Sequence, residues 1–196
     1  MMPFTVVTAT GLEAGAARRE LPRDVRVVQC GVALSRRSKF DDAAISCGLA
    51  GGTDRYLPSG TVLVPSEVGG PDGFRRVCDP ELVGALTEGA RRLGLEPVTA
   101  PLFTSPVLVR GAERARYCEM GFAGVDMETA LIDAPKIAAV RVVLDTPTRE
   151  LSEAWLSPLR VLVTPSAWSE LPWLLREAPR LSRLAARVIA SALPAK

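Results

Sequence analysis

The chain has 196 residues, of which 47% are hydrophobic, 23% charged and 5% aromatic, and its formal net charge is +2. This composition fits one globular domain with a sizeable core, and it excludes disordered and collagen-like classes. The small charge, with no basic block in any segment, argues against a nucleic-acid-binding protein.

Histidine is absent, which excludes Ser-His-Asp and Cys-His nucleophile systems and most zinc sites. Catalysis would have to use carboxylates, arginines and the backbone. The four cysteines are widely spaced and form no C-x-x-C pair, so we expect reduced thiols and a cytoplasmic protein. The N-terminus lacks the pattern of a signal peptide and no apolar run reaches about 18 residues, so we expect neither secretion nor a transmembrane segment.

Residues 5–9 form an apolar run rich in β-branched side chains, and a turn at Thr10 and Gly11 leads into LEAGAARREL. This pattern predicts a strand, a tight turn and the start of a helix. Free N–H groups at such a helix start can hold an anion or an attacking water. Neither phosphate-loop pattern is present, so a plain strand-to-helix turn without a ligand stays open.

Two further strands are predicted at residues 25–29 and 43–47, and the second of them runs into the glycine-rich segment 48–52. Glycines there would let the backbone approach a sugar or base closely, because no Cβ intervenes. A plain loop is the alternative. The sequence DPELVGALTEGARRLG then predicts a scaffold helix with Asp79 as N-cap, Pro80 in the first turn and Gly94 as the stop.

Residues 98–108 predict a bent strand or a strand pair, interrupted by Pro101 and Pro106. Phe103 in this stretch could stack on a purine or belong to the core. A short helix follows at residues 112–120, with Arg114 and Arg116 expected to point outward.

The end of the chain predicts helices. Thr148 could cap a helix with Leu151, Ala154 and Trp155 on one face. In the tail, residues 166–193, apolar residues recur at helical spacing, broken by Pro172 and Pro179, with arginines at the polar positions. A helix packed on the sheet explains this pattern, and a basic amphipathic surface that contacts lipid is the alternative.

Two carboxylates stand at the ends of apolar runs. Glu128 follows the alternating run 122–127 at a switch into a short helix, and Asp145 follows the buried run 138–144. Ligands collect at the carboxyl edge of open α/β sheets, so both are candidate catalytic groups. Burial would favour a protonated Asp145, whereas an ionised Glu128 could accept hydrogen bonds from paired hydroxyls. The alternative is that Asp145 caps a turn and Glu128 lies on a solvated helix start.

The segments VDMETA and VRVVLDTPTRELSEAW resemble two blocks of the nucleoside phosphorylase and nucleosidase superfamily, and SCGLAGGTDRYLPSGTVLVPSEV resembles a third. The overall pattern is most similar to the hopanoid-biosynthesis branch, the adenosylhopane nucleosidase type. The resemblance implies that Asp145 protonates the purine, that Glu128 holds the ribose hydroxyls and that Met127 packs under the sugar. The remaining substrate-binding positions that it implies are Gly48, Ala50, Gly51 and Phe103.

The chain departs from this family at several places. The Ser that precedes the catalytic Asp is Leu144, Ser59-Gly60-Thr61 replaces the usual Gly-Asp, and the segment after the second strand, where the family has a full helix, is shorter by roughly ten residues. The family's water-positioning Glu aligns with Gly15, so Glu13, two residues earlier, is the candidate replacement.

The sequence therefore predicts one α/β domain over residues 1–196, with a central mixed sheet flanked by helices and a shortened segment after the second strand. The predicted activity is hydrolysis of the N-glycosidic bond of a modified adenosine, without a metal or organic cofactor. Alternatives are a phosphorylase with phosphate as co-substrate, a futalosine or methylthioadenosine nucleosidase, and a non-catalytic nucleoside-binding protein. We expect a small nucleoside as partner, a homo-oligomer, and no nucleic acid, while peripheral contact with a membrane stays open.

Overall fold

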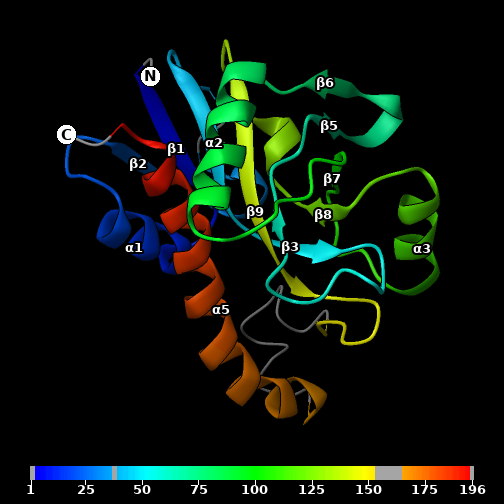
Figure 1. Cartoon of the computed structure of the whole chain (residues 1–196). Coiled ribbons are helices and arrows are strands. Elements are labelled where there is room, and N and C mark those ends of the chain that lie inside the picture. The colour runs from blue at the N-terminus through cyan, green and yellow to red at the C-terminus, as the bar shows by residue number, and fades with distance from the viewer. Residues whose placement is uncertain (1–2, 37–38, 153–164, 195–196) are drawn as a thin grey trace.

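The computed structural model describes residues 3–36, 39–152 and 165–194. In this part of the chain nine strands form one mixed sheet, and four α-helices lie around it (Figure 1). The strands are β1 (Phe4–Thr8), β2 (Arg26–Gln29), β3 (Ala43–Gly52), β4 (Val62–Leu63), β5 (Glu67–Gly69), β6 (Arg75–Val77), β7 (Leu102–Thr104), β8 (Gly124–Asp126) and β9 (Ile137–Asp145). The helices are α1 (Gly11–Glu20), α2 (Pro80–Arg92), α3 (Gly111–Glu119) and α5 (Pro165–Ala192), with 3-10 turns η1 (Val32–Leu34), η2 (Pro71–Gly73) and η3 (Thr129–Leu131). The predicted α/β class with a mixed central sheet is confirmed.

The sheet runs in the order β2-β1-β3-β8-β7-β5-β6, and β9 pairs with β3 and β4. Strands β1, β3 and β9 are mutually parallel through β3, and every residue of β9 is buried, as expected for a strand covered on both faces. The register places Gly48 beside Arg141 and Gly51 beside Asp145, with an irregularity between Ala50 and Gly51. Strand β8 pairs antiparallel with the last two residues of β3, and β9 ends at Asp145 beside the same part of β3. The start of β8 and the end of β9 therefore both lie next to the end of β3.

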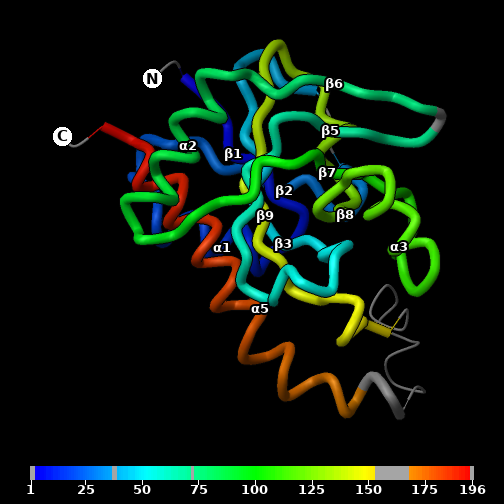
Figure 2. The backbone as a smooth tube through the Cα atoms, turned by 45° about the vertical axis from the view of Figure 1, so that its right-hand side comes forward, coloured from blue at the N-terminus to red at the C-terminus, as the bar shows by residue number. Residues whose placement is uncertain are grey.

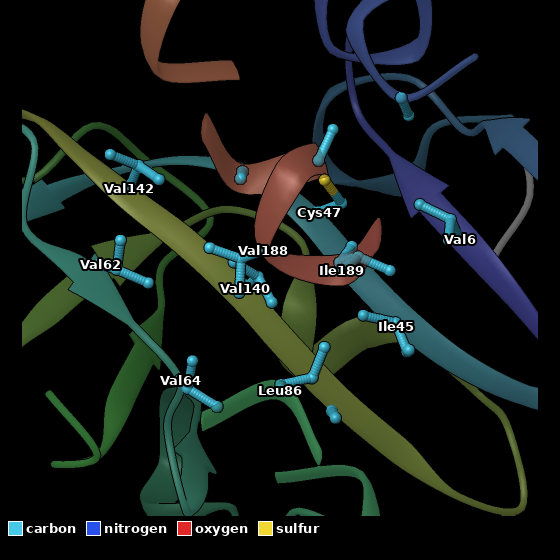
Figure 3. Close-up of a cluster of buried hydrophobic side chains, with 14 of the residues drawn as sticks. Val6, Ile45, Cys47, Val62, Val64, Leu86, Val140, Val142, Val188 and Ile189 are labelled. Atoms are coloured by element: carbon cyan, nitrogen blue, oxygen red, sulfur yellow. The ribbon is translucent and has the colours of Figure 1, made fainter. Parts of the chain in front are cut away.

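Helices α1, α2 and α5 pack against one another and cover one face of the sheet. In Figure 3 side chains of α5, among them Val188 and Ile189, lie over Ile45 of β3 and Val140 of β9. This cluster is the larger core. A second apolar cluster on the other side of the strands includes Ala44 and Val143.

Local signals at the helix starts are as predicted. Asp79 accepts a hydrogen bond from the Leu82 N–H at 3.0 Å and Pro80 opens α2, while Gly94 beyond its end has a φ of +73°. At α1, Thr10 and Glu13 form a reciprocal capping box. That box brings the candidate residue Glu13 to the turn that follows β1.

Several predicted boundaries are wrong. Strand β3 continues through the glycine-rich segment to Gly52, because β9 and β8 supply hydrogen-bonding partners along it. The bent strand expected at 98–108 is reduced to β7. The helix expected around Ala154 and Trp155 lies outside the described residues.

The C-terminal helix is not broken by its prolines: α5 runs continuously through Pro172 and Pro179. Pro172 is exposed and Pro179 is half-buried, so water can satisfy the carbonyl groups that lose their helical partners. The N-terminal half of α5 extends beyond the sheet, at the end where β9 also finishes (Figure 2). None of the helices in the described ranges is long and apolar enough to cross a membrane.

Candidate functional site

Glu13 lies at the third position of α1 and is buried. Its Oε2 accepts the Thr10 N–H and the Thr10 hydroxyl, each at 2.9 Å, and its Oε1 accepts the Leu49 N–H at 3.0 Å. A Cβ on Gly48 would stand 2.2 Å from that Oε1 and 2.8 Å from Arg141 Nη1. Gly48 thus lets a carboxylate from α1 and a guanidinium from β9 meet over the backbone of β3.

Arg141 is fully buried and lies close to carboxylates from two segments, α1 and the end of β8 with the turn after it. Its Nη2 lies 2.7 Å from Asp126 Oδ2 and 3.2 Å from Glu128 Oε2, and it donates to the Ser46 hydroxyl at 2.7 Å. We call Glu13, Asp126, Glu128 and Arg141 the Arg141 centre. It contains three carboxylates and one cation.

Glu128 lies between β8 and η3, as its position in the sequence predicts. Its Oε1 accepts the Ala33 N–H at 3.3 Å, so the turn η1 contacts it directly. Burial raises the pKa of Glu128 to about 7, helped by the negative charges of Asp126 and Glu13 and opposed by Arg141. This carboxyl group therefore exchanges its proton near neutral pH.

Asp126 is held in place by hydroxyl groups. The Thr104 hydroxyl donates to its Oδ1 at 2.6 Å, and Thr129 donates its N–H to Oδ2 at 3.1 Å. Asp126 is buried against Arg141 and anchors η3. Asp126 and Glu128 therefore share Arg141 as their cationic partner.

Asp145 ends β9 and is buried. Its Oδ2 accepts a hydrogen bond from Arg114 Nη2 at 2.6 Å and from the Leu151 N–H at 3.4 Å. Arg114 also donates to the carbonyls of Gly52 and Val109, each at 3.1 Å. We call this arrangement the Arg114–Asp145 pair.

The expectation that Arg114 points outward is wrong, because its guanidinium is buried and holds three separate segments of the chain. Arg116, two residues later in α3, is exposed as predicted, beside the aromatic side chains that lie near Phe103. Pattern alone could not identify Arg114, because its acidic partner Asp145 is 31 residues further along the chain.

A cavity of about 40 Å³ joins the two groups. It is lined by Asp145 and Arg114, by Asp126 and Met127, and by Gly51 and the segment 107–109. This volume accommodates a few water molecules and no nucleoside. A substrate could enter only if part of the wall moves, and Val107 in that wall is 55% exposed.

The structure therefore brings together Glu13, Glu128 and Gly48 at the Arg141 centre, and Asp145, Met127 and Gly51 around the cavity. Two other predicted positions lie elsewhere. Ala50 faces the second apolar cluster, and Phe103 stacks on Tyr117 with ring centroids 4.1 Å apart and meets Phe122 edge-on. Gly15, the aligned position of the family's Glu, has no neighbouring atom within 4 Å of its would-be Cβ.

In the described ranges, no group of three or more cysteine, aspartate and glutamate side chains is arranged to hold a metal ion. None of the four cysteines, all within the described ranges, forms a disulfide, and burial raises the pKa of Cys47 and of Cys78 to about 12. The thiols of Cys47 and Cys78 therefore stay protonated at neutral pH.

The chain matches no protein-family model and none of the curated proteins. Its fold is nevertheless that of solved nucleosidases. An S-adenosylhomocysteine nucleosidase from Streptococcus pyogenes, in complex with 5-methylthiotubericidin, has a TM-score of 0.71 at 16% identity, over 99% of this chain and 98% of that one. A methylthioadenosine/S-adenosylhomocysteine nucleosidase from Colwellia psychrerythraea, in complex with adenine, gives 0.69 at 17% identity, over 97% and 94%.

A futalosine hydrolase from Helicobacter pylori is as similar, with a TM-score of 0.69 at 13% identity over 96% of each chain. At such identities the likeness establishes the fold alone. The fold is the one that the resemblance to the nucleoside phosphorylase and nucleosidase superfamily predicts, and it extends over nearly the whole chain.

Proposed function

We propose that the chain is a nucleosidase that hydrolyses the N-glycosidic bond of a modified adenosine and releases adenine. The observation that carries the proposal is the meeting of Glu13 and Arg141 over Gly48, with Glu128 bound to Arg141, next to a cavity that Asp145 lines. Cleavage of such a bond develops positive charge on the sugar and negative charge on the base. Carboxylates on the sugar side would stabilise the positive charge, and a proton donor on the base side would neutralise the negative charge.

Glu128 is assigned to the ribose hydroxyls. An ionised carboxylate accepts two hydrogen bonds, which fits a pair of neighbouring hydroxyl groups. In the substrate-free molecule the Ala33 N–H and Arg141 bind its two oxygens, so the ribose would replace the Ala33 contact. Met127, half-buried at the cavity, would pack under the sugar.

Glu13 is assigned to the attacking water. It lies at the start of α1, where the helix N-terminus favours bound polar groups, and Gly48 leaves its Oε1 open to β3. In this proposal Glu13 takes the role of the family's water-positioning Glu, which aligns with Gly15 two residues later in the chain.

Asp145 is assigned to the base. Arg114 and the Leu151 N–H both bind Oδ2, while Oδ1 lies 3.1 Å from the would-be Cβ of Gly51 on the floor of the cavity. Oδ1 would therefore face the purine. A general acid of this kind contributes roughly a hundredfold to ten-thousandfold in rate.

Hydrolysis is favoured over phosphorolysis by the charge of the site. With three carboxylates and one cation, the Arg141 centre carries excess negative charge, which repels phosphate and stabilises a cationic sugar. No cofactor is needed for this chemistry. The sequence resemblance makes adenosylhopane-like nucleosides the first substrates to test, followed by methylthioadenosine and futalosine.

A second candidate is a non-catalytic nucleoside-binding protein. The specific observation in its favour is the pairing of Asp145 with Arg114, in which the Asp145 side chain accepts a hydrogen bond from the guanidinium rather than donating one.

The deciding experiment incubates the purified protein with adenosylhopane, methylthioadenosine or futalosine, with and without phosphate, and quantifies the released base by chromatography. Release of base without phosphate supports the nucleosidase. A phosphate requirement with a sugar 1-phosphate product would identify a phosphorylase. Measurable nucleoside binding without release would overturn the proposal in favour of the binding protein.

A further inference from the structure

Helix α5 has an apolar face that extends beyond the sheet that the helix covers. In its C-terminal half Leu181, Ala185 and Ile189 are completely buried. The N-terminal half projects beyond the body of the molecule (Figures 1 and 2), and there Leu171 is 39% and Leu175 67% exposed.

These exposed residues continue the face that packs on the sheet. Leu171, Leu175, Ala178, Ala185 and Ile189 follow one another at steps of three, four or seven, which is one side of an α-helix. Trp168, 58% exposed, lies one turn before Leu171. A helix that needed its apolar face only for folding would not continue that face past the sheet.

Arginines form a second row along α5. Arg176, Arg180, Arg183 and Arg187 recur at steps of three or four and are all exposed. Glu177 lies 3.0 Å from the first and 2.6 Å from the second, whereas neither of the other two forms an ion pair with any residue that the structure describes. The four arginines line a groove of about 590 Å³, with Glu20 of α1 as its acidic member.

We propose that this side of α5 docks on the surface of a lipid bilayer that contains anionic phospholipids. The apolar tip at Trp168, Leu171 and Leu175 would enter the headgroup region, and the arginines would bind lipid phosphates, as in amphipathic helices that lie at membrane interfaces. Charge decides between the partners. A second copy would present the same exposed arginines rather than the complementary negative charge that lipid phosphates offer.

The docking surface lies beside the candidate site. Past Asp145, the Arg149 guanidinium stacks 4.2 Å above the Trp173 ring and the Ser152 N–H donates to Glu170 at 3.1 Å. The chain that follows the candidate acid is therefore fastened to the projecting half of α5. If the proposed function holds, a nucleoside with a large apolar substituent could pass from the bilayer to the site. The docking itself does not depend on that activity.

The test is co-sedimentation of the full chain with vesicles of phosphatidylcholine alone and of phosphatidylcholine mixed with phosphatidylglycerol. We expect binding to the mixed vesicles, and less of it at high salt. Leu175→Asp, and separately the double change Arg183→Glu with Arg187→Glu, should each weaken that binding about tenfold or more. Val77→Asp is the matched control, because Val77 is 72% exposed on β6 and belongs to no part of this surface.

Far-UV circular dichroism of each variant establishes that it is folded, and because Leu175 and both arginines are exposed, their substitution should leave the core intact. Absence of binding to mixed vesicles by the wild-type chain would overturn the proposal. Binding that Leu175→Asp leaves unchanged would also overturn it. A dimer in light scattering that Leu175→Asp dissociates, together with no vesicle binding, would assign the surface to a second copy.

Discussion

In the part of the chain that the structure describes, two buried arginines have carboxylate partners, and the two groups differ in the ratio of negative to positive charges. The Arg141 centre has three carboxylates around one guanidinium. In the Arg114–Asp145 pair one buried carboxylate meets one guanidinium, and the next acid, Glu150, is 3.5 Å from Arg114 Nε and more exposed. The first group has surplus negative charge and the second is balanced.

This difference assigns different chemistry to the two ends of one cavity. Burial raises the pKa of Glu128 to about 7, and the negative charges of Asp126 and Glu13 add to the shift. The balanced pair holds the Asp145 side chain in place through Arg114. In the proposed mechanism the sugar side is therefore sensitive to pH, and the base side is fixed in geometry by Arg114.

The largest expected effect comes from the balanced pair. Asp145→Asn keeps the size and a hydrogen-bonding oxygen for Arg114 but removes the proton donor, so base release should fall about a hundredfold to ten-thousandfold. The measurement is the initial rate of base release under saturating substrate, with circular dichroism to verify the fold. Asp54→Asn is the matched control, since that carboxylate accepts the N–H of neighbouring Tyr56 away from the cavity. An unchanged rate for Asp145→Asn would refute the acid assignment.

The sequence predicted the carboxylates of this site better than the arginines. Glu128 and Asp145 stand where apolar runs stop, so the strand ends could be recognised without a structure. Glu13 was proposed only from its place beside the position that aligns with the family's Glu, and the structure shows that it belongs to a capping box. Arg114 was missed, because a charged residue in a short polar helix is normally exposed and its contacts come from segments far away in sequence.

The fold was predicted in the same uneven way. Patterns that act over a few residues, such as the N-cap Asp79 and the buried run of β9, gave the right elements. The course of β3 through Gly52 could not be predicted, because neighbouring strands rather than local preference keep those glycines extended. The unbroken path of α5 depends likewise on where its prolines lie relative to solvent.

The second prediction concerns removal of the cation from the Arg141 centre. Arg141→Met would leave three buried carboxylates without their cation, and the free energy of unfolding should fall by about 3 to 5 kcal/mol. Arg114→Met should cost less, because only one fully buried carboxylate loses its partner. Urea titration of both variants measures the difference. The Arg141→Met loss should shrink at acidic pH, where protonation relieves the repulsion, and an equal loss for both variants would contradict the comparison.

The third prediction concerns the pH dependence that Glu128 confers on stability. Its pKa is about 7 in the folded chain against 4.5 as the ordinary value. Below the ordinary value both states are protonated and stability is highest. Between the two values the unfolded chain loses the proton that the folded chain keeps, so stability falls with rising pH, in total by something on the order of 3 kcal/mol. Above about pH 7 the curve should be flat.

Glu128→Gln should remove this slope, so the variant should gain stability relative to wild type as the pH rises from 5 to 7. Urea midpoints at several pH values measure it. Activity should move in the opposite sense, because only the ionised carboxylate accepts both ribose hydroxyls: wild-type kcat/KM should rise through neutral pH, and the variant should be slow at every pH. A pH-independent stability difference would refute the raised pKa.

The smallest effect is expected for a substitution of Phe103. It tests whether this ring stacks on a purine or only packs in the aromatic cluster. Phe103 stacks on Tyr117 and meets Phe122, and it does not line the cavity at Asp145. Phe103→Leu keeps most of the apolar volume and removes the ring contacts, so unfolding free energy should fall by about 1 kcal/mol. KM should change less than twofold, since ring and cavity are separate. A KM increase of about tenfold, the equivalent of one stacking contact, would instead return Phe103 to the purine.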